Sequence, residues 1–473
     1  MDAKALDELR RKRRHNDDEK DDSRSRFQRD RDRVLYSSAF RRLAGVTQVV
    51  QAAEGHVFHN RLTHSLKVAQ VARRLSEYLL KFGNAEQIVE LGGLDSDVAE
   101  CAALLHDIGH PPFGHAAEYE IQRSFKERGI TDGFEGNAQS FRVATWVSSR
   151  DPSARGLDLT AASLAGLLKY PWHRQGDEGT RRSVKFGYYS SETDDFKHAR
   201  SFVMNDERKS LEAEIMDWAD DVTYAVHDVE DSFRSAMIPL DQLILGTEER
   251  ARFIDWFVLF DAARKAEREH TSADADKTRA DELAKAEEKK KALNAFFDLW
   301  EKEAPFPVVR EPFSNTRKAQ GMLQRFSSML ISRYLAIGAD GVTLGDPAKG
   351  RRLLIADWVR TEVDTWKSLM IYYVYEHPAL VAQQCGQRAI VKRLFDEMFE
   401  AVAKNARFSG LIPAPFRDER DDIREIVNTG ERERRTGRLV ADILCSMTEQ
   451  QALSLHARMS GFASGSIRDA IIH

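Results

Sequence analysis

The sequence has few cysteines and no CxxC pair. Its three cysteines, Cys101, Cys385 and Cys445, lie far apart in a chain of 473 residues. This spacing argues against a disulfide framework and fits free thiols in a reducing compartment. No apolar run reaches the roughly 18 residues that a membrane-spanning helix needs, and the N-terminus lacks the apolar core of a signal peptide. We therefore expect a cytoplasmic protein with no membrane partner.

An excess of charge of one sign is also lacking. The chain has 71 Lys and Arg against 76 Asp and Glu, a net charge of −5, so bulk charge gives no reason to expect nucleic-acid binding. We find no internal repeat, no Walker-type Gly-Lys loop and no GxSxG elbow. A hydrophobic content of 42% is sufficient for a globular fold, and the length predicts two or more packed lobes.

The pattern along the chain predicts a mainly α protein with at most a short β-hairpin, placed near residues 46–58. Residues 1–34 are nearly all charged and predict a solvated tail or arm. Residues 35–235 carry the densest motifs, and residues 236–473 predict a C-terminal helical region. Within the latter, residues 261–291 are rich in Ala, Glu, Lys and Arg, which indicates a solvent-exposed helical hairpin or a mobile insertion.

One stretch, CAALLHDIGHPPFGHAAE at residues 101–118, holds an unusual concentration of chemistry. An apolar helical run ends at His106–Asp107, and the glycines and prolines that follow prevent its continuation. A new helix restarts near residue 116, with His115 and Glu118 three residues apart on one face. The segment from His106 to Glu118 therefore holds three imidazoles and two carboxylates within thirteen residues.

Two neighbouring helices add candidate metal ligands to this segment. His64 lies in the first turn of a helix predicted over residues 61–82, and Asp220 lies in a helix over residues 211–233. A single histidine beside an apolar stripe is more often a core residue, and a row of acids is more often a solvated face. With His106 and Asp107, however, they form a set of two imidazoles and two carboxylates that fits a catalytic divalent ion. Mn, Mg, Co, Fe and Zn are not distinguished, and Asp221 is the alternative ligand if Asp220 points away.

The order of motifs closely resembles the deoxyguanosine triphosphate triphosphohydrolase family of the HD-domain metal phosphohydrolases. The motifs are DRDRVLYSSAFRRLAGVTQV, NRLTHSLKVAQVA, LLHDIGHPPFGHAAE, FEGNAQSFR, LLKYPW, KFGYYSSE and ADDVTYAVHDVED, and a weaker RLVADILCSMTEQQA near the end. The resemblance is strong over residues 30–235 and thin in the C-terminal half. Val46 stands where the family usually has lysine, and MTEQQA departs from the family's MTDRYA.

The resemblance implies an HD-domain helical bundle with an additional C-terminal helical lobe. It also implies hydrolysis of a deoxynucleoside triphosphate (dNTP) to the deoxynucleoside and inorganic triphosphate. Carried over, His64, His106, Asp107 and Asp220 are metal ligands, and His115 is catalytic with Glu118 as its partner. The expected substrate-binding residues are Gln48, Arg42, Asn137, Lys169, Tyr170, Lys185, Tyr224 and Asp228. Of these, Lys169, Tyr170 and Lys185 match positions near the phosphates, and Gln48 and Tyr224 match positions near the sugar. The functional interpretation of Arg42 is a phosphate or base contact.

Other functions stay open at this point. One alternative is an HD-type phosphohydrolase acting on another nucleotide, such as a monophosphate or a guanosine tetraphosphate alarmone. Another is a nucleotide-responsive, nucleic-acid-binding regulator that keeps a vestigial site. The resemblance further implies a homo-oligomer, a hexamer among the options, and a nucleotide activator or single-stranded DNA as further partners.

Overall fold

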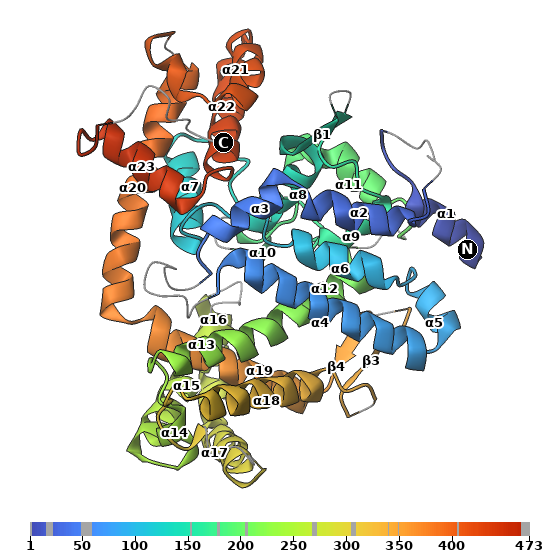
Figure 1. Cartoon of the computed structure of the whole chain (residues 1–473), viewed down its shortest axis with the longest axis vertical. Coiled ribbons are helices and arrows are strands. Elements are labelled where there is room, and N and C mark those ends of the chain that lie inside the picture. The colour runs from blue at the N-terminus through green and yellow to red at the C-terminus, as the bar shows by residue number, and fades with distance from the viewer. Residues whose placement is uncertain are drawn as a thin grey trace.

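The computed structural model describes residues 2–15, 22–48, 59–151, 154–176, 180–203, 207–266, 272–303, 309–338, 340–348, 350–403 and 406–464. Helices dominate these residues, as the sequence predicts (Figure 1). The only strands among them form two antiparallel pairs, β1 (Ser149–Asp151) with β2 (Ala154–Arg155), and β3 (Val342–Leu344) with β4 (Leu353–Ile355). The predicted hairpin near residues 46–58 falls mostly outside the described residues, and its described edge is a single bridge between Thr47 and Asn60.

Three helices form the centre of the N-terminal half. They are α4 (Arg61–Phe82), α6 (Ser96–Leu105) and α12 (Leu211–Thr223), and each packs against the other two. In α4 the apolar residues recur every three or four positions, so Ala72, Leu75 and Leu79 fall on one face and are buried. Asn60 caps this helix by accepting a hydrogen bond from the Thr63 amide. The packing brings the N-terminal end of α4 beside the C-terminal end of α6.

Shorter elements surround this centre. On the N-terminal side they are α1 (Ala3–Arg11), α2 (Arg26–Leu35), α3 (Ser38–Arg42), η1 (Leu43–Gly45) and α5 (Ala85–Glu90). Between α6 and α12 lie α7 (His115–Glu127), α8 (Gly136–Arg142), η3 (Val143–Val147), α9 (Ala161–Leu167), α10 (Arg181–Val184), η4 (Ser190–Glu192) and α11 (Thr193–Ala199). After α12 the chain makes a π-helical turn, η5 (Tyr224–Asp228), and continues as α13 (Val229–Arg234).

The charged N-terminal segment is not a solvated tail in its described part, which corrects the expectation for residues 1–34. Leu6 and Phe27 are buried against α9, in a small core of their own. The buried Arg10 side chain pairs with Glu212 of α12, and Arg13 pairs with Asp30 at 2.6 Å. Ion pairs this deeply buried anchor a segment, because removing one partner leaves an uncompensated charge that costs about 3–5 kcal/mol.

The C-terminal half contributes two groups of helices. The first comprises α14 (Leu240–Ile244), α15 (Glu248–Ala266), α16 (Ser272–Ala284), α17 (Ala286–Glu303), α18 (Arg317–Tyr334), α19 (Asp357–Met370) and the π-helical η7 (Ile371–Tyr375). The described part of the charged segment 261–291 lies in α15–α17, and α16 has no buried side chain among its described residues. Ion pairs such as Lys265 with Glu282, 2.7 Å apart, join α15 to α16.

The second group packs on α7. Helix α20 (Pro378–Ala403) runs between the two groups, and η8 (Ala406–Leu411), η9 (Ala414–Phe416), α21 (Arg417–Arg424), α22 (Thr429–Leu444) and α23 (Glu449–Met459) follow it (Figure 1). Ile121 and Phe125 of α7 share a core with Phe395 of α20 and Leu439 of α22. No helix within the described residues is long and apolar enough to cross a membrane.

Candidate active site

The loop between α6 and α7 is fixed against α8. Ser140 of α8 donates its hydroxyl proton to the His106 carbonyl at 2.9 Å and accepts the Gly109 amide at 3.0 Å. A Cβ atom on Gly109 would lie 2.1 Å from the Ser140 nitrogen, so only glycine allows this approach. Phe113, with a φ of 68°, completes the turn into α7. The loop therefore holds His106 and Asp107 at one end and His115 at the other.

Four candidate ligands from three elements meet beside this loop. The Nε2 atom of His64 lies 3.1 Å from Oδ1 of Asp220. The Nε2 atom of His106 lies 3.7 Å from the same oxygen and 3.5 Å from Oδ2 of Asp107. The ligand atoms of His64, His106 and Asp107 lie within 4.8 Å of one another. The structure thus brings together the complete set of two imidazoles and two carboxylates.

The hydrogen bonding of His106 prepares it to bind a metal. Its Nδ1 atom lies 2.6 Å from the Ala103 carbonyl, which fixes the proton on Nδ1 because a carbonyl only accepts. Its Nε2 atom is buried and has no hydrogen-bond partner among the described residues. A buried lone pair without a donor is the arrangement expected of a metal-binding imidazole whose other nitrogen is held by the protein. The residues present therefore fit a divalent ion.

Cations around the cluster hold its carboxylates ionised. Burial raises the pKa of Asp107, but the Arg61 guanidinium, which pairs with Asp107, and the nearby imidazoles bring it well below its usual range. Burial also raises the pKa of Asp220, but Lys169, 3.2 Å away, together with His64 and His106 brings it well below its usual range. Asp221 faces away from the cluster and pairs with Lys367, so the structure places Asp220 rather than Asp221 at the ligand position.

A second chain of side chains extends from the ligand cluster. Oδ1 of Asp107 lies 3.0 Å from Nδ1 of His110, and Nε2 of His110 lies 3.1 Å from Oε1 of Glu118. The other oxygen of Glu118 lies 2.9 Å from Nδ1 of His115. The His115 side chain is 74% exposed, so its Nε2 edge is free for a ligand. Gly136 of α8 makes room for this chain, because a Cβ atom there would lie 2.2 Å from Oε1 of Glu118.

The lysines expected near phosphates lie around the two clusters. Lys169 contacts Asp217 at 2.9 Å as well as Asp220. Lys185 pairs with Glu135 at 3.0 Å, and its charge helps to lower the pKa of Glu118. Asn137 also binds Glu135, through its side-chain amide at 2.9 Å. In the described protein both lysines are neutralised by carboxylates.

Tyr170, half-buried, completes the lysine group. Burial raises its pKa, and the charges of Lys169 and Lys185 oppose this shift, so the Tyr170 hydroxyl lies within electrostatic range of both lysines. Its ring also contacts Trp172, with the ring centres 5.6 Å apart. The structure therefore groups Tyr170 with both lysines.

Two of the expected substrate-binding residues, Tyr224 and Asp228, lie on the π-helical turn after α12. The Tyr224 hydroxyl donates to the Tyr375 hydroxyl at 2.9 Å, which ties η5 to η7. Asp228 is buried, and its Oδ2 atom finds no hydrogen-bond partner in the part of the chain that the structure describes. Burial and the nearby Asp231 and Asp220 raise its pKa well above the usual range. The buried Oε1 atom of Gln48 likewise has no partner within the described ranges. π-Turns within helices are frequent at functional sites.

Arg42 does not fit the expected role of a phosphate ligand. It is buried and donates to three main-chain carbonyls, those of Met447, Ile108 and His110, at 2.9, 3.0 and 2.7 Å. Burial lowers its pKa to about 10. Its guanidinium therefore joins the loop after His106 to the C-terminal segment. This corrects the expectation that Arg42 binds substrate.

Glu449, at the start of α23, makes a second such link. Its carboxylate accepts the Thr47 amide at 2.9 Å, the Thr47 hydroxyl at 2.7 Å and the Phe113 amide at 3.1 Å. The Glu449 side chain thus holds Thr47, which precedes Gln48, and Phe113, which lies two residues before His115. It lies in the MTEQQA segment, where the chain departs from the expected family pattern.

Comparison with known proteins agrees with this geometry. Residues 61–225 match the HD domain, and residues 354–458 match the phosphohydrolase-associated domain. A deoxyguanosinetriphosphate triphosphohydrolase-like protein of Streptomyces coelicolor is 34% identical over 452 residues, which cover 93% of each chain. The chain belongs to this dGTPase-like family of HD-domain proteins. A relative of the same name from Corynebacterium efficiens is 33% identical over 93% of each chain. One from a Caulobacter strain is 43% identical over 226 residues, 47% of this chain and 51% of that protein.

Membership of the dGTPase-like HD family makes the protein a phosphohydrolase that depends on a divalent metal. Three residues of its site were given no role from the sequence: His110, Glu135 and Glu449. The sequence did contain a signal for His110, because this histidine lies only three residues after Asp107, in the same motif and on the same loop. Glu135 and Glu449 had none, because their contacts depend on how α8 and α23 approach the loop.

Proposed function

We propose that this protein hydrolyses a deoxynucleoside triphosphate to the deoxynucleoside and inorganic triphosphate. The observation that carries the proposal is the continuous line from Asp107 through His110 and Glu118 to His115, which joins the metal-ligand cluster to an exposed imidazole. Lysines on both sides of it supply the charge that a triphosphate requires. The names of the relatives, which describe them as deoxyguanosinetriphosphate triphosphohydrolase-like, support the same substrate class.

In this proposal His64, His106, Asp107 and Asp220 hold the divalent ion. When bound, such an ion neutralises phosphoryl oxygens and acidifies water. Lys169 and Lys185 exchange their present carboxylate partners for phosphate oxygens, which charge-assisted hydrogen bonds favour. These cations compensate the roughly four negative charges of the substrate in a protein whose net charge is −5.

His115 and Glu118 form the acid–base pair that protonates the leaving group. A water oxygen joins the α-phosphorus and releases one proton to the solvent, the bond from phosphorus to the sugar 5′ oxygen breaks, and the triphosphate stays intact. The departing alkoxide is a poor leaving group, so it needs a proton, and His115 is placed to donate one from Nε2. Glu118 accepts the Nδ1 proton of His115 and stabilises its charged form, while His110 keeps Glu118 oriented.

Product identification tests this function. Each dNTP is incubated with the metal-loaded protein, alone and in mixtures, and the phosphate products are separated by ion exchange. We expect inorganic triphosphate and deoxynucleoside in equal amounts. Release of orthophosphate or pyrophosphate would instead indicate a different HD phosphohydrolase. No turnover of any dNTP with any divalent metal would favour the alternative of a nucleotide-responsive, nucleic-acid-binding regulator.

A further inference from the structure

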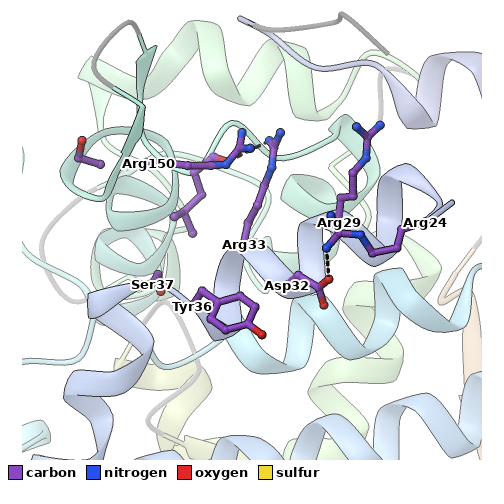
Figure 2. A pocket seen from close by; sticks show the side chains of 9 residues that line it. Arg24, Arg29, Asp32, Arg33, Tyr36, Ser37 and Arg150 are labelled. Atoms are coloured by element: carbon purple, nitrogen blue, oxygen red, sulfur yellow. Dashed lines mark hydrogen bonds and ion pairs between the residues drawn. The ribbon is translucent and has the colours of Figure 1, made fainter. Parts of the chain in front are cut away.

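A second cavity lies away from the metal-ligand cluster, between α2, the start of α3 and β1 (Figure 2). Its volume is about 350 Å³, and none of the residues lining it belongs to the site described above. Four of its nine lining residues are arginines. We call it the arginine pocket, and its lining residues are Arg24, Arg29, Asp32, Arg33, Tyr36, Ser37, Ser149, Arg150 and Leu157.

The cations of the arginine pocket are only partly compensated. Arg24 pairs with Asp22 at 2.7 Å and with Asp32 at 2.5 Å. Within the part of the chain that the structure describes, neither the Arg29 nor the Arg150 guanidinium makes a hydrogen bond or an ion pair. Among the described residues, the pocket therefore has two guanidinium groups without an ion-paired carboxylate, beside two arginines, Arg24 and Arg33, that are already paired.

Arg33 shows that this charge lies against the protein interior. Its side chain is only 10% exposed, and it donates to the Leu157 carbonyl at 3.1 Å. Burial, together with the charges of Arg13 and Arg150, lowers its pKa to about 10, although Asp30 and Asp158 oppose the shift. Figure 2 shows the Arg33 and Arg150 side chains extending toward each other. Like charges held close in a half-buried pocket are relieved by a bound anion.

We propose that the arginine pocket binds the phosphate chain of a di- or triphosphate, separately from the active site. Guanidinium forks match phosphate oxygens two at a time, which makes arginine the preferred residue for such recognition. The ring of Tyr36, 81% exposed at the pocket, offers a surface on which a nucleotide base can stack. A nucleotide and free polyphosphate are the two sources of such a phosphate chain, and both present the same oxyanions. A bounded cavity of this volume fits a small ligand better than a nucleic-acid strand, which needs an extended basic groove.

Binding to the full-length protein tests this proposal, which does not depend on the proposed function. The protein is treated with EDTA to prevent turnover and carries Lys185→Ala to weaken phosphate binding at the active site. Calorimetric titration at low ionic strength then uses tripolyphosphate, dGTP, deoxyguanosine and oligo(dT) as probes. We expect tripolyphosphate and dGTP to bind, deoxyguanosine to fail, and affinity to fall as salt is added.

The decisive variant is Arg29→Ala with Arg150→Ala, which we expect to weaken tripolyphosphate binding by at least about tenfold, since two charge-assisted contacts are lost. The matched control is Arg252→Ala with Arg393→Ala, two exposed arginines far from the pocket in sequence, which should change affinity less than about twofold. Arg150→Glu, a single change at an exposed position, gives a second measurement if the double variant folds poorly.

The probes separate the two sources of phosphate and the competing ligand. Tighter binding of dGTP than of tripolyphosphate would assign the site to a nucleotide, and equal binding would assign it to the phosphate chain alone. Both results support the proposal. Equal loss in the control variant, unchanged binding in the pocket variants, or stronger binding of oligo(dT) than of tripolyphosphate through the same arginines would each overturn it.

Discussion

Replacing Glu449 by alanine tests how far the C-terminal segment controls the catalytic loop. The change removes the acceptor of the Phe113 amide and of both Thr47 donors. Phe113 is buried and Thr47 is half-buried, so water can replace the lost bonds only at Thr47. An unsatisfied buried amide costs about 1–3 kcal/mol. The left-handed conformation of Phe113, with a φ of 68°, depends on that bond as well.

A loss of this size changes the population of the native loop by roughly 5- to 150-fold. Hydrogen exchange followed by mass spectrometry should therefore show faster exchange in the segment that contains Phe113, and kcat should fall because His115 follows two residues later. Metal content should stay unchanged, since the ligand cluster keeps its own contacts. Gln450→Ala, at an exposed position of the same helix, is the control and should leave both measurements unchanged. Unchanged exchange at Phe113 in Glu449→Ala, or metal lost in parallel with activity, would refute the reasoning.

Four further outcomes follow from the site and its surroundings. Asp107→Ala should lose both metal, measured by plasma mass spectrometry, and turnover; full occupancy would contradict its role as a ligand. His115→Ala should keep its metal and lose about 10²–10⁴-fold in kcat, and a loss below about tenfold would reject acid–base catalysis. Tyr224→Ala should lower the ratio of kcat/KM for dGTP over GTP, because an unpaired ribose hydroxyl no longer meets the ring; an unchanged ratio would leave tyrosine with a packing role only. Burial raises the pKa of Asp132, but arginines such as Arg438 bring it below its usual value. The ionised Asp132 therefore stabilises the folded protein at any pH above the unfolded pKa of about 3.9, and this stabilisation is lost as the pH falls through the lower folded pKa. Urea unfolding should accordingly show Asp132→Asn less stable by about 1–3 kcal/mol at pH 7, with a difference that shrinks below about pH 4.

Local patterns predicted the helical class and the groups that meet at the site. The apolar spacing in residues 61–82 gave a helix with the bounds of α4, and the Gly and Pro residues after Asp107 gave the loop. The sequence pattern could not predict the packing of the N-terminal segment, because its few apolar residues are scattered among many charged ones and form no recognisable stripe. The partner of Arg10 lies 202 residues away, and such a pair becomes visible only when α1 and α12 are in place. Arg42 illustrates the same limit, since an arginine that binds main-chain carbonyls has the same sequence signature as one that binds phosphate.

The core shared by α7, α20 and α22 bears on how the protein can be divided. Helix α7 turns Ile121 and Phe125 away from the HD bundle and toward the C-terminal helices. A fragment that ended at residue 225, where the HD domain match stops, would leave these side chains in water and would lose the helix that supplies Glu449. Such a fragment would not fold correctly by itself, because α7, the helix that begins with His115, would lack its packing partners. We therefore expect limited proteolysis between α19 and α20 to inactivate the protein rather than to release a working catalytic module, and we expect a separately expressed C-terminal fragment to restore activity by complementation.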